Sequence, residues 1–106
     1  MKENEFETWL KEGYFTRNGI PLEKRPRSDA LSRCRRVEKY EGDLDAHFKK
    51  DKMWSLLEAL TYTKADQEAG VSPQHTIPID GNILNGTASL RNAVKLYLQL
   101  CLDGQR

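Results

Sequence analysis

The feature that most constrains this chain is the segment of residues 87–102, which is apolar on almost every side of a helix. With helical spacing, its apolar face consists of Leu90, Ala93, Val94, Tyr97, Leu98, Cys101 and Leu102. Leu96 and Leu100 extend this face almost around the helix. A helix this apolar either lies at the centre of the fold or uses its second face to contact a partner. We therefore expect a fold organised around the last helix.

Shorter helical patterns precede this segment, and strand patterns are weak throughout. The spacing of Phe6, Trp9 and Leu10 predicts a helix over about residues 3–12. An apolar stripe predicts a second helix over about residues 51–62 with Asp51 as its N-cap, after a helical turn within residues 43–49. Thr63 with Asp66 resembles a capping box opening a short helix over residues 63–69. The expected fold is all-α, a compact bundle of four to five helices.

Two long connections are expected, near residues 13–27 and 71–86. Pro21 and Pro26 argue against a regular helix in the first. The second is rich in proline, glycine and asparagine, and we expect an ordered loop pinned by its isoleucines. For His75 within it, surface exposure or a hydrogen bond within the loop is a better expectation than a catalytic role.

The overall composition indicates one globular domain over residues 1–106. The chain has 106 residues, 38% of them hydrophobic and 31% charged, with a net charge of +1. No segment has the roughly 20 apolar residues that a membrane span needs, and the acidic first ten residues do not resemble a signal peptide. Cys34 and Cys101 do not form a disulfide framework, so a cytoplasmic location is expected, with both cysteines packed on apolar helix faces.

Positive charge is concentrated between residues 24 and 39. Seven cationic side chains stand there against Asp29 and Glu38, a local balance of +5. We expect a helix with Ser28 as its N-cap and Gly42 at its end, which packs by one face and presents Arg33, Arg35, Arg36 and Lys39 on the other. Lys24, Arg25 and Arg27 are expected in the loop before it. Such a segment is typical of nucleic-acid contact. The candidate nucleic-acid-binding residues are Lys24, Arg25, Arg27, Arg33, Arg35, Arg36 and Lys39.

The alternative interpretation of the basic segment is a solvated surface whose cations are partly paired with Glu38, Glu41 and other acidic residues. Nothing in it indicates base-specific recognition, because few Asn or Gln residues accompany the arginines. About four to six phosphate contacts would give a log–log salt dependence of roughly −4 to −5.

No pattern in the chain indicates catalysis, a cofactor or a metal site. The glycines around residues 81 and 86 do not have the spacing of a phosphate-binding loop. Asp43, Asp45 and His47 alternate on a helical turn and so point in different directions, with no further His or Cys nearby. We expect a protein that is not an enzyme and needs neither cofactor nor metal.

The order of these patterns resembles a known family. Phe6, Trp9, Leu10, Gly13 and Tyr14, then the basic helix from Ser28 to Tyr40, then Ser89 to Leu98 look like the N-terminal core-binding domain of tyrosine recombinases, the phage integrases. The resemblance implies an all-helical, SAM-like bundle that clamps one side of DNA without doing chemistry. The chain departs from the family in three respects: its first loop is longer, its second loop contains prolines, and the catalytic domain of a recombinase is lacking. The resemblance therefore implies a stand-alone or excised module of the kind found in prophages.

Two functional hypotheses follow. The first is a small non-catalytic DNA-binding module that grips the phosphate backbone through residues 24–39. The second is a protein-interaction or homodimerisation module that uses the apolar helix of residues 87–102, for which a near-neutral net charge is also suitable.

Overall fold

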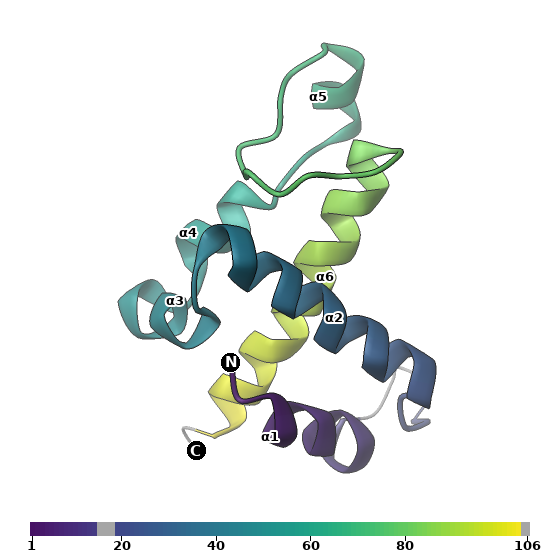
Figure 1. Cartoon of the computed structure of the whole chain (residues 1–106), viewed down its shortest axis with the longest axis vertical. Helices are drawn as coiled ribbons and strands as arrows, with labels where there is room; N and C mark the ends of the chain where they lie inside the picture. The colour runs from purple at the N-terminus through teal and green to yellow at the C-terminus, as the bar shows by residue number, and fades with distance from the viewer. Residues whose placement is uncertain (15–18, 105–106) are drawn as a thin grey trace.

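The computed structural model describes residues 1–14 and 19–104, and these residues are mostly helical, with no β-strand among them. Figure 1 shows how the helices are arranged. The elements are α1 (Glu3–Thr8), the π-helical turn η1 (Trp9–Gly13), α2 (Lys24–Glu41), α3 (Leu44–Asp51), α4 (Trp54–Ala59), α5 (Lys64–Glu68) and α6 (Ile83–Asp103). The all-α class is confirmed. The described residues hold six α-helices rather than four to five.

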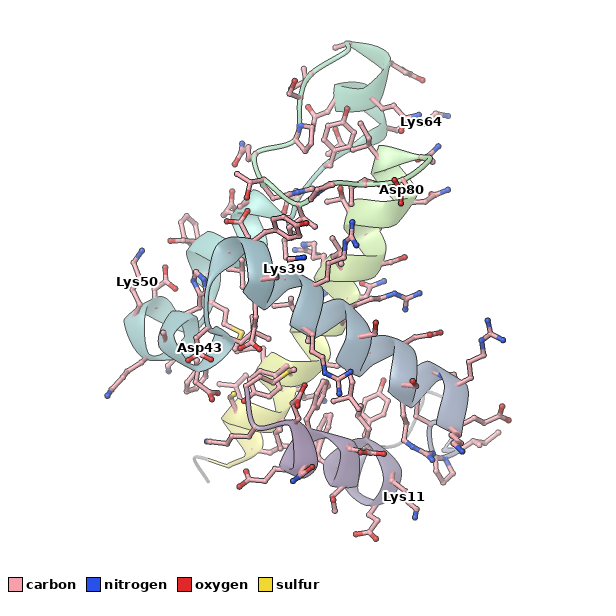
Figure 2. All side chains as sticks on the ribbon, in the orientation of Figure 1. Lys11, Lys39, Asp43, Lys50, Lys64 and Asp80 are labelled. Atoms are coloured by element: carbon pink, nitrogen blue, oxygen red, sulfur yellow. The ribbon has the colours of Figure 1, made fainter. Side chains whose placement is uncertain are left out.

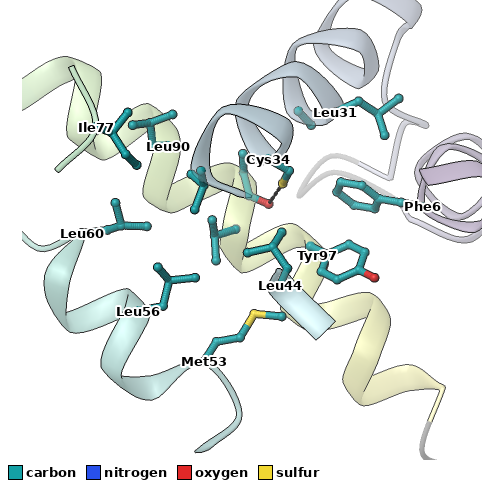
Figure 3. Close-up of a cluster of buried hydrophobic side chains, with 14 of the residues drawn as sticks. Phe6, Leu31, Cys34, Leu44, Met53, Leu56, Leu60, Ile77, Leu90 and Tyr97 are labelled. Atoms are coloured by element: carbon teal, nitrogen blue, oxygen red, sulfur yellow. Dashed lines mark hydrogen bonds between the residues drawn. The ribbon is translucent and has the colours of Figure 1, made fainter. Parts of the chain in front are cut away.

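Helix α6 is the centre of the fold, and α2 crosses it (Figure 1). In the core close-up of Figure 3, Phe6 from α1 meets the ring of Tyr97 edge-on, with ring centroids 5.1 Å apart. The thiol of Cys34 on α2 donates a hydrogen bond to the backbone oxygen of Ala93 on α6 at 3.3 Å. Leu44 and Met53 from the middle of the chain are also fully buried. The last helix is therefore the element on which the others pack.

Helix α2 begins earlier than expected, at Lys24 rather than after Ser28. Its N-cap residue is Glu23, whose side chain makes no capping hydrogen bond. Pro26 lies in the first turn, where backbone N–H groups have no intrahelical partner and proline is tolerated. The prediction of Ser28 as N-cap and of a loop reaching residue 27 was therefore wrong. The connection runs over residues 14–23, of which 15–18 lie outside the described residues. Gly42 ends the helix as expected, with φ 93°.

The helix expected over residues 51–62 is divided differently. Helix α3 continues through Asp51, and Lys52 and Met53 then adopt left-handed conformations, with φ 55° and 67°, before α4 begins. Asp51 still accepts a hydrogen bond from the backbone N–H of Ser55 at 3.1 Å, so it caps the next helix from one turn away. The reversal places Met53, which is fully buried, in the core.

The loop before α6 is ordered and shorter than expected. Helix α6 begins at Ile83, and the side chain of Asn82 accepts a hydrogen bond from the N–H of Asn85 at 3.0 Å. The loop is held to the core by Ile77 and His75, which are 3% and 5% exposed. The capping box of Thr63 and Asp66 is present and opens α5.

Candidate nucleic-acid interface

The basic segment lies on α2, which packs by one face only. Ala30, Leu31, Cys34 and Val37 are buried along that face. Helix α2 lies across α6, and charged side chains, including the labelled Lys39, project along it (Figure 2). The other side of α2 therefore carries Arg33, Arg35, Arg36 and Lys39, as the sequence pattern predicted.

Three of the seven predicted cations have no partner within the described part of the chain. Lys24, Arg25 and Arg33 are exposed and form no hydrogen bond or ion pair there. Asp29 stands one helical turn from both Arg25 and Arg33, yet no ion pair joins it to either. These three side chains keep their full charge toward solvent.

Two arginines bind backbone carbonyl groups. Arg27 donates to the oxygen of Leu22 at 2.5 Å, and this partly buried contact turns it toward the loop before α2. The guanidinium group of Arg36 donates to the backbone oxygen of Pro78 in the loop before α6. A carbonyl oxygen carries no net charge, so these contacts position the two guanidinium groups without neutralising them. Because it faces inward, Arg27 is the least available of the seven.

The remaining two cations have other partners. Arg35 forms an ion pair with Glu3, which joins α2 to α1. Their side chains are 56% and 45% exposed, so the pair contributes little to stability, about 0–1 kcal/mol. The ammonium group of Lys39 lies 5.5 Å from the centre of the Tyr40 ring. Arg35 is thus the one member of the set with a carboxylate partner inside the described residues.

Helical geometry divides these side chains by direction. At about 100° per residue, Arg25, Arg36 and Lys39 fall within an arc of about 60° that faces away from the core. They extend over about 21 Å of the helix axis, since each residue advances about 1.5 Å. We call these three residues the outer stripe. Arg33 lies to the side of the stripe that faces α6, and Lys24 and Arg35 lie to the side that faces α1.

The acidic residues of α2 do not neutralise the outer stripe. Glu38 accepts hydrogen bonds from the Met1 amino group at 2.9 Å and from the N–H of Leu44 at 3.0 Å. Glu41 accepts one from the N–H of Thr76 at 2.8 Å. The pairing of the arginines with Glu38 and Glu41, which the alternative interpretation expected, is therefore not found in the described residues.

The other candidate groups are used for structure. Asp43 and Asp45 lie 2.8 Å and 3.5 Å from the Met1 amino group, and the Nε2 atom of His47 lies 2.6 Å from the backbone oxygen of Glu41. No group of three His, Cys, Asp or Glu side chains suited to a metal ion occurs within the described residues. Burial raises the pKa of the Cys34 thiol to about 12, so it is not a nucleophile near neutral pH.

A second surface feature lies on the outer face of α6. A groove of about 480 Å³ is lined by Leu96, Leu98 and Leu102 from α6 together with Tyr14. Leu102 is 40% exposed, and Leu96 and Leu98 are half-buried. This groove is one part of the apolar helix that the core does not fully cover.

Comparison with known proteins gives no relative: no family model, no curated protein and no solved structure matches the chain. Among the helices of the described residues, none is both long enough and apolar enough to cross a bilayer.

Proposed function

We propose that this protein is a small non-catalytic DNA-binding module that holds the phosphate backbone along the outer stripe of α2. The observation that carries the proposal is the lack of ion pairs along α2: six of its seven predicted cations have no carboxylate partner in the described residues. A dense row of uncompensated cations is costly for a helix by itself, because like charges one turn apart repel each other. Phosphate groups would relieve that repulsion.

The stripe is suited to the backbone rather than to base edges. Its members are Arg25, Arg36 and Lys39, without a neighbouring Asn or Gln that could read an adenine. Arg36 is oriented by its bond to Pro78, which lowers the entropy lost when its guanidinium group meets a phosphate. The resemblance to the recombinase core-binding domain is in accord with this role, since it too implies contact between the basic helix and phosphates. We therefore propose binding that tolerates many sequences.

The test is a titration of a short labelled DNA duplex by fluorescence anisotropy at about 50 and 200 mM salt. With the three phosphate contacts that the outer stripe supplies, the affinity should fall about 40-fold between these concentrations. The variant Arg25→Glu with Lys39→Glu should weaken binding and reduce the log–log salt slope by about 2. Both side chains are exposed, and neither supports the core.

The matched control is Lys11→Glu with Lys64→Glu, which makes the same change in net charge at exposed positions on η1 and α5. Equal weakening by both variants would mean that only net charge matters, and the proposed surface would be wrong. Absence of binding at the lower salt concentration would remove the function itself.

The groove on α6 supports a second candidate function, homodimerisation or contact with a protein partner. The observation that favours this function is that Leu102 is exposed and lines the groove together with Leu96 and Leu98. Sedimentation equilibrium of the unmodified protein and of Leu102→Lys would test it. A dimer that dissociates in the variant supports this function, and a monomer at all concentrations argues against homodimerisation.

A further inference from the structure

A separate cleft opens between the start of α1, helix α3 and the end of α6, with a volume of about 790 Å³. In Figure 1 these elements surround the N-terminus, below and to the left of α2. The volume is in the range of sites for small molecules, about 300–1,000 Å³. None of the residues of the outer stripe lines this cleft, so it is distinct from the proposed DNA surface.

The floor of the cleft is apolar. Phe48 from α3 and Leu100 and Cys101 from α6 line it, and all three are only half-buried. Beneath them lies Tyr97, whose hydroxyl group already donates to Asp45 and accepts the N–H of Lys2. The floor thus offers apolar area that a ligand could remove from water, which stabilises binding by about 25 cal/mol per Å².

The rim of the cleft is cationic. Lys2, Lys49, Lys50 and Lys52 line it, all four are exposed, and none forms an ion pair within the described residues. Figure 2 shows the labelled Lys50 projecting from α3. Lys49 and Lys50 occupy the last turn of α3, where they offset the negative end of the helix dipole. Lys52, the C-cap residue of α3, lies at the same end of the dipole, but that reason does not apply to Lys2, which precedes α1.

The carboxylates of the cleft are largely engaged. Asp45 accepts the Tyr97 hydroxyl group at 2.5 Å and lies 3.5 Å from the Met1 amino group. Asp51 accepts both the N–H and the hydroxyl group of Ser55. Glu5 is the one lining carboxylate without such a partner among the described residues. Hydrogen bonds from the neutral groups of Ser55 and Tyr97 do not remove the charge of Asp51 and Asp45, so four lysine ammonium groups stand against three carboxylates (Glu5, Asp45 and Asp51) around the apolar floor. The lining therefore keeps an excess of one positive charge, and Asp45 lies 3.5 Å from a further cation, the Met1 amino group.

We propose that this cleft binds a small amphipathic anion, a free molecule with an apolar chain and one acid group, for which a fatty carboxylate is the simplest example. The chain lies on the floor formed by Phe48, Leu100 and Cys101, and the acid group meets the lysine rim. The charge of the rim selects an anion, and the concave shape selects a free ligand over a flat membrane surface. This inference does not depend on DNA binding.

The test is a titration of the isotope-labelled full chain with decanoate below its micelle concentration, followed by NMR. Saturable shifts confined to residues of α1, α3 and the end of α6 are expected. Decyltrimethylammonium, which has the same chain and the opposite charge, should cause much smaller shifts. Lys49→Glu with Lys52→Glu should weaken decanoate binding about tenfold or more, whereas Lys11→Glu with Lys64→Glu should leave it unchanged.

Should the charge-reversal variant unfold, Lys2→Ala with Lys50→Ala replaces it, with Lys11→Ala and Lys64→Ala as its control. Equal binding of the cationic amphiphile, shifts that map to the α6 groove, or no loss in the rim variants would overturn the proposal. Co-sedimentation with vesicles containing anionic phospholipid provides the remaining comparison. Binding to such vesicles without any binding of decanoate would show a membrane surface instead, and would also overturn it.

Discussion

The hydroxyl group of Tyr97 on α6 donates a hydrogen bond to Oδ1 of Asp45 on α3 at 2.5 Å. The hydroxyl oxygen of Tyr97 in turn accepts a hydrogen bond from the backbone N–H of Lys2 at 2.9 Å. Tyr97 is fully buried, and burial, with the hydrogen bond to Asp45, raises its pKa well above the usual range. One side chain thus ties the start of the chain, α3 and the central helix together.

Tyr97→Phe should destabilise the protein by about 1–3 kcal/mol, because it leaves the N–H of Lys2 and one oxygen of Asp45 without a partner. Urea unfolding followed by circular dichroism measures this. Tyr62→Phe is the matched control, since Tyr62 donates to the backbone oxygen of Val71 at 2.6 Å at an exposed site. Loss of this hydrogen bond should lower the free energy of unfolding by less than about 0.5 kcal/mol. Equal effects would show that the Tyr97 hydrogen bonds do not stabilise the fold.

The Met1 amino group should make stability decline in alkali. Burial alone would lower its pKa, but hydrogen bonds to Asp43 and Glu38 outweigh burial and raise the pKa from 8.0 to about 10. The folded state therefore holds this proton more tightly, and the stabilisation is complete below pH 8.0 and disappears as the pH rises to about 10. Because Asp43 is half-exposed, solvent screens its interaction with the amine. We therefore expect the free energy of unfolding to fall by about 1–2 kcal/mol over this pH range.

Urea unfolding between pH 7 and 10 measures this loss for protein prepared with a free Met1 amine. An N-terminally acetylated preparation is the control, because it has no proton to release at this position. If both preparations have the same pH dependence, the amine does not form the bonds to Glu38 and Asp43 in solution.

His75 should make stability decline in mild acid. Its Nδ1 atom accepts the N–H of Ile77 at 3.1 Å, so the neutral ring carries its proton on Nε2, which lies 2.9 Å from the hydroxyl oxygen of Thr87. Burial lowers its pKa below 6.5, although Glu41 partly opposes this. The stabilisation that the neutral His75 ring provides is therefore complete above pH 6.5. It is lost as the pH falls through the lower pKa that His75 has in the folded state.

An NMR titration of the His75 ring should give a pKa below that of a free histidine, and His75→Gln should remove part of the stability change between about pH 7 and 5. A midpoint at or above 6.5 would contradict the burial of a neutral ring. Because the loop of His75 and Ile77 also carries Pro78, the partner of Arg36, protonation should loosen that end of α2 as well.

The sequence predicted the features of the fold that depend on nearby residues. The stripe of Leu90, Ala93, Val94 and Tyr97 identified the central helix, and Thr63 with Asp66 identified the start of α5, because caps and apolar stripes act within a few residues. The start of α2 was misplaced because Ser28 satisfied a cap rule while Pro26 was read as a helix breaker. Both residues are in fact tolerated in the first turns.

The orientation and pairing of the basic side chains depend on contacts with residues far away in the sequence, which no local pattern reveals. Arg36 binds Pro78, 42 residues away, and Arg35 binds Glu3, 32 residues away. Periodicity correctly placed Arg33, Arg35, Arg36 and Lys39 away from the buried face. It could not show that Arg27 would turn inward or that Glu38 would turn toward Met1. The cleft lined by Lys2 and Lys52 was also missed, since it forms only when α1 and α3 meet the end of α6.

Gly86→Ala should destabilise the protein by about 1–3 kcal/mol, although alanine ordinarily favours a helix. A Cβ atom at Gly86, in the first turns of α6, would lie 2.5 Å from a methyl group of Ile79, which is β-branched and has little freedom to move. Asn85→Ala, at the exposed neighbouring position, should change stability by less than about 0.5 kcal/mol. Thermal unfolding compares the two, and a stabilised Gly86→Ala protein would show that the loop does not pack on α6 as described.

Lys52→Gly should stabilise the protein by about 1 kcal/mol. Lys52 has φ 55° between α3 and α4. This left-handed conformation costs a residue with a side chain about 1–2 kcal/mol, and glycine avoids that cost. Part of the gain is lost because glycine is more flexible in the unfolded chain. Lys50→Gly, within α3, is the control and should destabilise by about 1 kcal/mol with the same loss of charge. Urea unfolding of both variants measures the difference. Destabilisation by both would mean that the turn between α3 and α4 is not left-handed at Lys52.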